Sequence, residues 1–294
     1  MGKQLVIKKV EQSTMIYQHN ALIGSIQRLT LPGKRALLMA LGLVGNKDVK
    51  PDGTVRDEFG VITTVTVADY ASIFNMDLRN ASTDIYAGVT DLTTATVTVR
   101  SIVDGVPNED IYPWLHHTNI EDAKSERGKY TFTLNPDVLQ FVGLLESNFT
   151  AYDLLNVGEL KSTNQVRLYE LFAQHKTHGM KAGVNFGTWI TDADFFKGKV
   201  FNLGTSVKKF PTEIKRRFLD GALDAINDTT DLFVEFEVKG KQWIFKIYSG
   251  DIAEKKREKW RKERAEAVLK AKEEKRLARL RKQIAAHQAE EATK

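Results

Sequence analysis

Positively charged side chains gather at the start of one predicted helix of this chain, and their spacing points to the binding of an anion. The helix is expected from Phe210 to Asn227, because its apolar residues fall on one side at about 100° per residue and Pro211 occupies a favoured first position. Cations are unfavourable at the positive end of a helix dipole, so we expect phosphate or base-edge contacts to offset them. An ordinary solvated helix face is the alternative. The residues of this predicted surface are Lys208, Lys209, Thr212, Lys215, Arg216 and Arg217.

A second helix, predicted over Arg79 to Thr93, offers polar chemistry of the same kind with less positive charge. Its hydroxyl, amide and guanidinium groups could reach bases or phosphates. Asp84 and Asp91 would oppose a close approach to a polyanion, so a DNA-contacting helix and a protein-contacting helix both remain open. The residues assigned to this second surface are Arg79, Asn80, Ser82, Thr83 and Tyr86.

Motifs for enzymatic chemistry are missing from the sequence. The chain has no cysteine, which excludes disulfides, zinc–thiolate sites, iron–sulfur clusters and cysteine nucleophiles. It has no phosphate-cradling Gly-x-x-x-x-Gly-Lys-Ser/Thr loop, no Gly-x-Gly-x-x-Gly and no His-Glu-x-x-His. His116 and His117 are adjacent, and His175 and His178 lack a third ligand, so we interpret the latter two as a surface pair. The sequence therefore predicts no catalytic residue, no metal site and no cofactor.

Composition and charge are those of a folded cytoplasmic protein. The 294 residues are 42% hydrophobic and 28% charged, and the longest apolar run, Ala36 to Gly45, is half of what a bilayer requires. The start of the chain lacks the features of a secretory signal. Lys and Arg number 14 against 17 Asp and Glu in residues 1–150, 14 against 12 in residues 151–250, and 15 against 9 in residues 251–294. Basic charge rises toward the C-terminus, as expected if the later parts approach a polyanion.

The elements that must position the helix of residues 79–93 have the order of a winged helix, a helix-turn-helix with an added β hairpin. Thr66 and Asp69 form a capping box, and Asn75 to Asp77 break the short helix before the next one begins. A polar loop separates the last two strands. The predicted elements are helices at Asn20–Thr30, Pro32–Val44, Thr66–Phe74 and Arg79–Thr93, and strands at Val61–Val65, Ala95–Val103 and Tyr130–Leu134.

The second half of the sequence repeats this plan. Its predicted elements are a helix over Asn164–Lys176, a Gly-rich loop, an irregular piece around Asp192–Phe196, the helix from Phe210, and a hairpin of Leu232–Val238 with Trp243–Tyr248. We therefore predict an α+β fold of two tandem winged helices with a charged C-terminal helical tail. The predicted domains are residues 15–148, residues 149–250 and the basic, helical or disordered tail of residues 251–294.

The composition changes abruptly in the tail. Between Glu254 and Ala289 it contains neither Gly nor Pro, and its apolar residues align on one stripe only in the last part. A coiled coil would need a sustained heptad stripe, so a solvated or partly disordered helix is favoured over pairing. Deletion of residues 251–294 is expected to weaken the salt dependence of DNA binding without changing the site that is chosen.

Two blocks in the second half resemble a known family. LKSTNQVRLYEL at residues 160–171 and FPTEIKRRFLDGALDAINDTTDL at residues 210–232 resemble the signature of the plasmid replication initiators, the iteron-binding Rep proteins of theta-replicating plasmids. The resemblance extends over residues 15–250 and leaves the basic tail unexplained. Further matches in the first half and at the interdomain junction are Asn20, Leu22, Leu29, Thr30, Phe149 and Tyr152.

The resemblance implies an origin-binding protein without enzymatic activity. Members of that family bind double-stranded DNA with direct repeats as monomers, help to open an AT-rich segment, and recruit the host replication initiator and the replicative helicase. As homodimers joined through the N-terminal domain, they bind an inverted repeat and repress their own gene. The resemblance assigns DNA contact and dimerisation to residues 15–148, the main DNA reading to residues 149–250, and backbone contact to Lys239 and Lys241. It also implies a place in the bacterial cytoplasm, with the nucleoid or the plasmid.

Three other functions are weighed against the initiator. A sequence-specific transcriptional repressor without an initiator role would use the same surface, although a two-domain monomer makes it less natural. A structural or partitioning protein would need the missing heptad stripe, and a nicking enzyme would need a histidine pair beside a tyrosine such as Tyr169, which we interpret as a core residue. The DNA beside the gene separates the first two, since direct repeats indicate an initiator and one short palindrome indicates a repressor.

Overall fold

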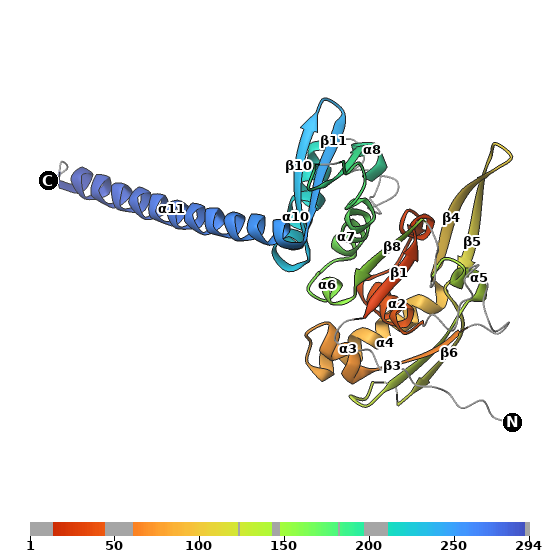
Figure 1. Ribbon diagram of the computed structural model, residues 1–294. Coiled ribbons are helices and arrows are strands. Elements are labelled where there is room, and N and C mark those ends of the chain that lie inside the picture. The colour runs from red at the N-terminus through yellow and green to blue at the C-terminus, as the bar shows by residue number, and fades with distance from the viewer. Residues whose placement is uncertain are drawn as a thin grey trace, which may run out of the picture.

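Two winged helices in tandem, followed by one long helix, make up the chain, so the predicted α+β fold class is confirmed (Figure 1). The computed structural model describes residues 14–44, 61–122, 124–142, 148–181, 183–196 and 211–291. Within the described residues the first winged helix holds two three-stranded antiparallel sheets, the second holds one, and a two-stranded sheet joins the two domains.

In the first winged helix, three helices pack against an antiparallel sheet. The elements are α2 (Leu31–Leu43), β3 (Val61–Thr66), α3 (Val67–Ile73), α4 (Leu78–Thr94), β6 (Leu115–Glu121) and β7 (Lys129–Leu134). The predicted start of α3 is confirmed, because the Thr66 hydroxyl accepts from the Asp69 amide at 3.1 Å. Asn75 turns the chain with φ 49°, and the Asp77 side chain then caps α4. At Gly88 an added Cβ would overlap the Pro32 carbonyl, so glycine allows α4 to lie close against α2.

The predicted strand at Ala95–Val103 is confirmed, but the polar loop predicted after it contains two further strands, at Val106–Pro113 and Leu115–Glu121. β4 (Thr96–Val103) and β5 (Val106–Pro113) make a hairpin, and the short strand β2 (Ile26–Gln27) pairs with β4 to complete their sheet. Beyond this hairpin, β6 pairs with β7, and α5 (Pro136–Leu139) follows. Nearly every side chain of β5 is exposed, so no alternation of buried and exposed residues marks this strand in the sequence.

The helix predicted over Asn20–Thr30 is wrong beyond its first turn. Helix α1 (Asn20–Ile23) ends at Gly24, and the Ser25 hydroxyl donates to the Leu22 carbonyl at 2.5 Å. A serine that binds the backbone in this way competes with helix continuation, and the chain passes into β2. Thr30 begins the next helix instead, because its hydroxyl accepts from the Gly33 amide at 3.2 Å.

The second winged helix repeats the order of helix, strand, helices and hairpin. Its elements are α7 (Thr163–His175), β9 (Gly187–Asp192), α8 (Ala193–Phe195), α9 (Pro211–Ile214), the π-helical segment η3 (Lys215–Leu219), α10 (Asp220–Thr229), β10 (Leu232–Lys239) and β11 (Gln242–Ser249). The predicted hairpin is confirmed, and β9 pairs with β11 as a third strand that was not predicted. Phe172 of α7 packs its ring against Trp189 of β9 and Phe245 of β11. Tyr169 is buried as predicted, and its hydroxyl donates to Asp231 at 2.8 Å.

A strand that precedes the first winged helix pairs with a strand that follows it. These are β1 (Met15–His19) and β8 (Phe149–Asp153), which run antiparallel with Tyr17 opposite Ala151. The short helix α6 (Leu155–Gly158) then leads into α7. This pairing ties both ends of the first winged helix to the start of the second.

Three charged side chains with at most 3% of their surface exposed lie where α2 meets α7, and they are Lys34, Arg167 and Glu170. The Lys34 Nζ lies 2.8 Å from one Glu170 carboxylate oxygen, and the Arg167 Nη1 lies 3.6 Å from the other. The Tyr152 hydroxyl donates to the same carboxylate at 2.7 Å, and the Arg167 Nη2 donates to the Ser25 carbonyl at 2.7 Å. Burial lowers the pKa of Lys34, and the carboxylate of Glu170 opposes this shift. One buried carboxylate therefore pairs with cations from both halves of the chain.

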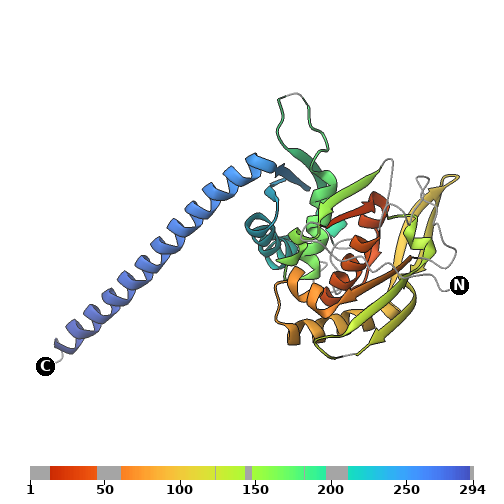
Figure 2. The ribbon, with the colours of Figure 1, turned by 60° about the horizontal axis from the view of Figure 1, so that its bottom comes forward.

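The C-terminal tail is one continuous helix, α11 (Gly250–Glu291), which projects from the second winged helix as a rod (Figure 1, Figure 2). Its first turns are packed against that domain, where Ala253 is fully buried and Arg257 is only 5% exposed. The helix therefore begins inside the second winged helix, and a deletion from residue 251 would remove part of its core. No helix within the described ranges is long and apolar enough to cross a membrane.

His175, at the end of α7, is half-buried against the aromatic core, so it is not the surface residue that the sequence predicted. Its ring stacks on Trp189 with 4.9 Å between centroids and 7° between planes, and His178 lies edge-on at 5.7 Å. Burial lowers the pKa of His175 to about 4, and the charge of His178 adds to this shift. The imidazole is therefore neutral in the folded protein under ordinary conditions.

Replacement of Glu170 by Gln is expected to lower the free energy of unfolding by about 3–5 kcal/mol, because it leaves Lys34 and Arg167 buried without an anion. Glu109 provides the matched control, since it pairs with Arg100 at 2.7 Å where both side chains are half exposed. Glu109→Gln should cost no more than about 1 kcal/mol. Urea unfolding of the wild type and of both variants measures the two losses of unfolding free energy. Equal losses would show that the buried ion pairs stabilise the fold no more than an exposed pair does.

The stability of the fold is expected to fall as the pH decreases from 6.5 to 4. In that range the unfolded chain binds a proton at His175 and the folded chain does not, so acid favours unfolding. His175→Phe removes this titration and keeps a ring against Trp189, so its unfolding free energy should depend less on pH than that of the wild type. Urea titrations across the range measure the difference, and parallel pH profiles would contradict the assignment.

Candidate nucleic-acid interface

Two exposed arginines of the second winged helix lie on the first turns of the helix formed by α9, η3 and α10, called here the recognition helix (residues 211–229). Thr212, Arg216 and Arg217 are exposed, as predicted, while Ile214 is fully buried. The segment η3 is a π-helical turn, a rare geometry that occurs frequently at functional sites. The recognition helix thus presents two guanidinium groups and a hydroxyl at the protein surface.

Glu213 neutralises part of this charge within the protein. Its carboxylate lies 3.1 Å from the Arg216 Nη2 and 2.7 Å from the Arg217 Nε. The hydrogen bond from Arg216 holds the pKa of Glu213 below its ordinary value. These cations therefore have an anion within the protein, contrary to the expectation from the sequence, and a phosphate would have to compete with Glu213 for them.

Lys215 faces the β hairpin of its own domain. Its Nζ lies 2.8 Å from the Asp220 carboxylate and 6.0 Å from the centroid of the Phe236 ring in β10. At the far end of the hairpin, Lys239 and Lys241 are both exposed on either side of the turn. The predicted wing residues are therefore at the surface, while Lys215 is half-buried at the base of the wing. Lys208 and Lys209 lie outside the described residues.

In the first winged helix, α4 exposes Arg79, Asn80 and Thr83 on its first two turns, and Tyr86 is half-buried one turn further on. Ser82 is only 4% exposed, and its hydroxyl donates to the Ser125 carbonyl at 3.2 Å. The expectation that Ser82 contacts nucleic acid is therefore corrected, because this side chain holds α4 against the turn between β6 and β7.

The two acidic residues expected to oppose a polyanion are engaged within the domain. Asp84 accepts from the Tyr70 hydroxyl at 2.6 Å and pairs with Arg35 at 3.2 Å. Asp91 accepts from the backbone amide and the hydroxyl of Thr30, both at 2.8 Å. The ion pair with Arg35 makes Asp84 a smaller obstacle to a polyanion than the sequence indicates, whereas Asp91 keeps its negative charge, because its hydrogen bonds from Thr30 come from neutral donors.

Two cations in the turn between β6 and β7 were missed by the sequence analysis. The Lys124 Nζ lies 5.4 Å from the centroid of the Tyr86 ring, and Arg127 is exposed in the same turn. The basic run KSERGK at residues 124–129 could have indicated a DNA-contacting turn, but this stretch was interpreted only as a polar loop. This turn is the wing of the first domain.

Each winged helix thus holds a helix with exposed guanidinium and hydroxyl groups beside a basic wing. Such a pair of elements can set cations against a phosphate backbone and guanidinium or amide groups against base edges. Among the side chains that the structure describes, no group of three or more His, Asp or Glu residues could hold a metal ion.

Comparison with known proteins gives a family and a fold. The sequence profile described as "Initiator Replication protein, WH1" matches residues 15–173. An uncharacterized 27.6 kDa protein of Escherichia coli is 30% identical over 248 residues, which cover 82% of this chain and 96% of that protein. The crystal structure of the Pi initiator protein in complex with iteron DNA matches with a TM-score of 0.63 and 20% sequence identity, over 82% of this chain and 100% of that chain. The profile spans more than half of the sequence, and the chain therefore belongs to the initiator replication protein family defined by this first winged helix.

Proposed function

We propose that this protein initiates the replication of a plasmid by binding repeated sites, or iterons, at the origin through both winged helices. The observation that carries the proposal is the pairing, in each domain, of a polar and basic helix with a basic wing. Membership of the initiator family supports the same conclusion. So does the likeness in fold to the Pi initiator protein, whose structure is that of a complex with iteron DNA.

In this proposal the second winged helix, within residues 149–250, makes the main reading contacts. Arg216 and Arg217 exchange the carboxylate of Glu213 for phosphates or guanine edges, and the wing lysines contact the backbone. The exchange costs little, because exposed ion pairs are weak. The complete proposed surface of this domain is Lys208, Lys209, Thr212, Lys215, Arg216, Arg217, Lys239 and Lys241.

The first winged helix, within residues 15–148, is proposed to contact the adjacent part of the same site and to form the homodimer. Its proposed DNA contacts are Arg79, Asn80, Thr83, Tyr86, Lys124 and Arg127. The outer strand β5, which has the exposed apolar side chains Val106 and Ile111, supports a second copy as partner of this domain.

Beyond DNA binding, we infer the roles that the initiator family implies. The monomer helps to open an AT-rich segment and recruits the host replication initiator and the replicative helicase, without a catalytic step of its own. The dimer represses the gene of the protein. These steps take place in the bacterial cytoplasm, on the plasmid or the nucleoid.

Footprinting on the DNA that flanks the gene, with excess competitor DNA at roughly physiological salt, tests the proposal. Regularly phased protection over several direct repeats is the expected result. Protection of one inverted repeat alone would favour a dimeric repressor without an initiator role. Salt-sensitive protection without any preferred site would remove the main support for an initiator.

Replacement of Arg216 by Ala is expected to weaken binding to the specific site by about 1–3 kcal/mol and to relax the preference at one base pair. Binding titrations on the repeat and on single-base variants measure both effects. Lys161→Ala, which removes an exposed cation outside the proposed surfaces, is the control and should bind as the wild type does. Equal weakening on all DNA would make Arg216 a phosphate contact, and unchanged binding would refute the assignment of the recognition helix.

Replacement of Glu213 by Gln should strengthen DNA binding, because it removes a negative charge from the surface and frees both arginines from their ion pairs. The effect is expected on specific and mixed-sequence duplexes alike, since it concerns charge and not base recognition. Binding titrations at a fixed salt concentration measure it. Weaker binding by Glu213→Gln would indicate instead that Glu213 positions the arginines for DNA.

A further inference from the structure

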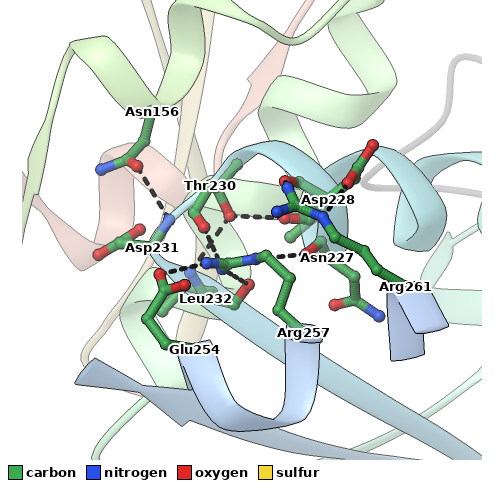
Figure 3. Close-up of polar contacts among 10 residues, drawn as sticks. Asn156, Asn227, Asp228, Thr230, Asp231, Leu232, Glu254, Arg257 and Arg261 are labelled. Carbon is green, nitrogen blue, oxygen red and sulfur yellow. Dashed lines mark hydrogen bonds and ion pairs between the residues drawn. The ribbon is translucent and has the colours of Figure 1, made fainter. Parts of the chain in front are cut away.

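One buried arginine fastens α11 to the C-terminal end of the recognition helix. The Arg257 Nε donates to the Asn227 carbonyl at 2.6 Å, and its Nη2 donates to the carbonyls of Thr230 and, at 3.1 Å, Leu232 (Figure 3). Glu254 pairs with the Nη1 of the same guanidinium. A cation is favourable there, because the last carbonyls of a helix carry partial negative charge. The start of α11 is therefore fixed relative to the helix that we propose to read bases.

Two more ion pairs set the direction of α11 along the recognition helix. The Arg261 Nε lies 2.7 Å from Asp228 (Figure 3), and the Arg264 Nη1 lies 3.1 Å from Asp224. These contacts neutralise acidic residues of the recognition helix, while Arg216 on its earlier turns stays exposed. The anchored part of α11 thus covers one side of the recognition helix and leaves its proposed DNA-binding groups open.

Beyond this anchor, the helix continues as a rod away from the body (Figure 2). Its side chains are exposed from Leu269 to Arg281. At 3.6 residues per turn, four cations fall within an arc of about 100° on two successive turns. These cations, called here the basic face of α11, are Lys272, Lys275, Arg276 and Arg279.

The basic face has no counterion among the described residues, where no ion pair joins any of its four side chains to a carboxylate. Like charges three and four positions apart destabilise a helix, and a polyanion beside them relieves this repulsion. The four residues span about 10 Å along the axis at 1.5 Å per residue. Phosphates recur at about 3.4 Å along one strand of duplex DNA, so their charge density can match the basic face.

A membrane surface fits this helix less well. Interfacial helices bury a broad apolar face that carries aromatic and leucine side chains. Here no aromatic residue follows Trp260, and the narrow stripe of Leu269, Leu277 and Leu280 contains Glu273. The proximity of the anchor to the recognition helix also favours DNA as the polyanion.

We propose that the basic face of α11 binds the phosphate backbone of duplex DNA beside the site that the recognition helix contacts. The inference rests on the proposed DNA binding of the second winged helix and adds a contact surface outside both winged helices. Because the anchor fixes the rod, the contact is specific to one face of the helix. A loose basic tail would instead attract DNA with all of its cations equally.

The test compares two double variants that each remove one lysine and one arginine from the exposed rod. Lys272→Gln with Arg279→Gln removes charge from the basic face, and Lys270→Gln with Arg281→Gln removes it from the opposite side. Gln forms helices well, so both variants should keep their helical content, which circular dichroism checks. Dissociation constants are measured against salt concentration on a mixed-sequence duplex and on the footprinted DNA.

The variant of the basic face should show a logarithmic salt slope less steep by about 1.8, the value for two lost phosphate contacts, and the opposite-side variant should keep the wild-type slope. Equal reductions in both variants would overturn the proposal in favour of diffuse attraction. No reduction in either would also overturn it, and site-specific protection by the wild type would then leave the initiator function standing. Failure of the wild type to select any site would refute the initiator function, while the slopes on mixed-sequence DNA would still decide the role of α11.

Discussion

Glu170 has no surface exposed to water, and the two cations that pair with it come from different halves of the chain. Lys34 belongs to α2 of the first winged helix and Arg167 to α7 of the second. Removing such charges from water is costly, and their attraction compensates for the cost only while the geometry is kept. A rotation of one winged helix against the other would leave a buried charge without its partner. The orientation of the two helices that face nucleic acid in our proposal therefore depends on this carboxylate.

Other ion pairs of the protein lie closer to its surface, and the degree to which each pair is buried determines its role. Arg257 is buried at the end of the recognition helix, so its contacts fix the position of α11. Glu213 and its two arginines are partly or fully exposed to solvent, so in our proposal these weak pairs open when a phosphate arrives. The first winged helix follows the same rule, since the partly buried Asp84 holds α4 in place while Arg79 remains exposed on the same helix. Buried pairs set the geometry, and exposed pairs supply cations for exchange.

Local signals allowed most of the helices and the second hairpin to be predicted, because capping at Thr66 and alternation in β10 and β11 act over a few residues. The pairing of β1 with β8 could not be predicted in this way, since its partners lie more than 100 residues apart. The exposed strand β5 could not be predicted either, because its sequence lacks the alternation of apolar and polar residues that marks a half-buried strand. At the site, residue types indicated the exposed arginines, but not that Ser82 faces inward or that Glu213 pairs with them. The direction of Ser82 depends on a neighbour that only the folded chain brings close, whereas Glu213 lies three and four residues before its arginines, a spacing that pairs charges on a helix and that the sequence already contained.

The central claim is that the buried cluster presents both winged helices to one DNA site. Hydroxyl-radical footprinting of a single direct repeat tests this claim most directly, with the wild type compared with Arg79→Ala and Arg216→Ala. We expect two protected clusters about 10.5 base pairs apart on one face of the duplex. Each variant should weaken a different cluster. Protection of one cluster only, lost in Arg216→Ala and unchanged in Arg79→Ala, would contradict it.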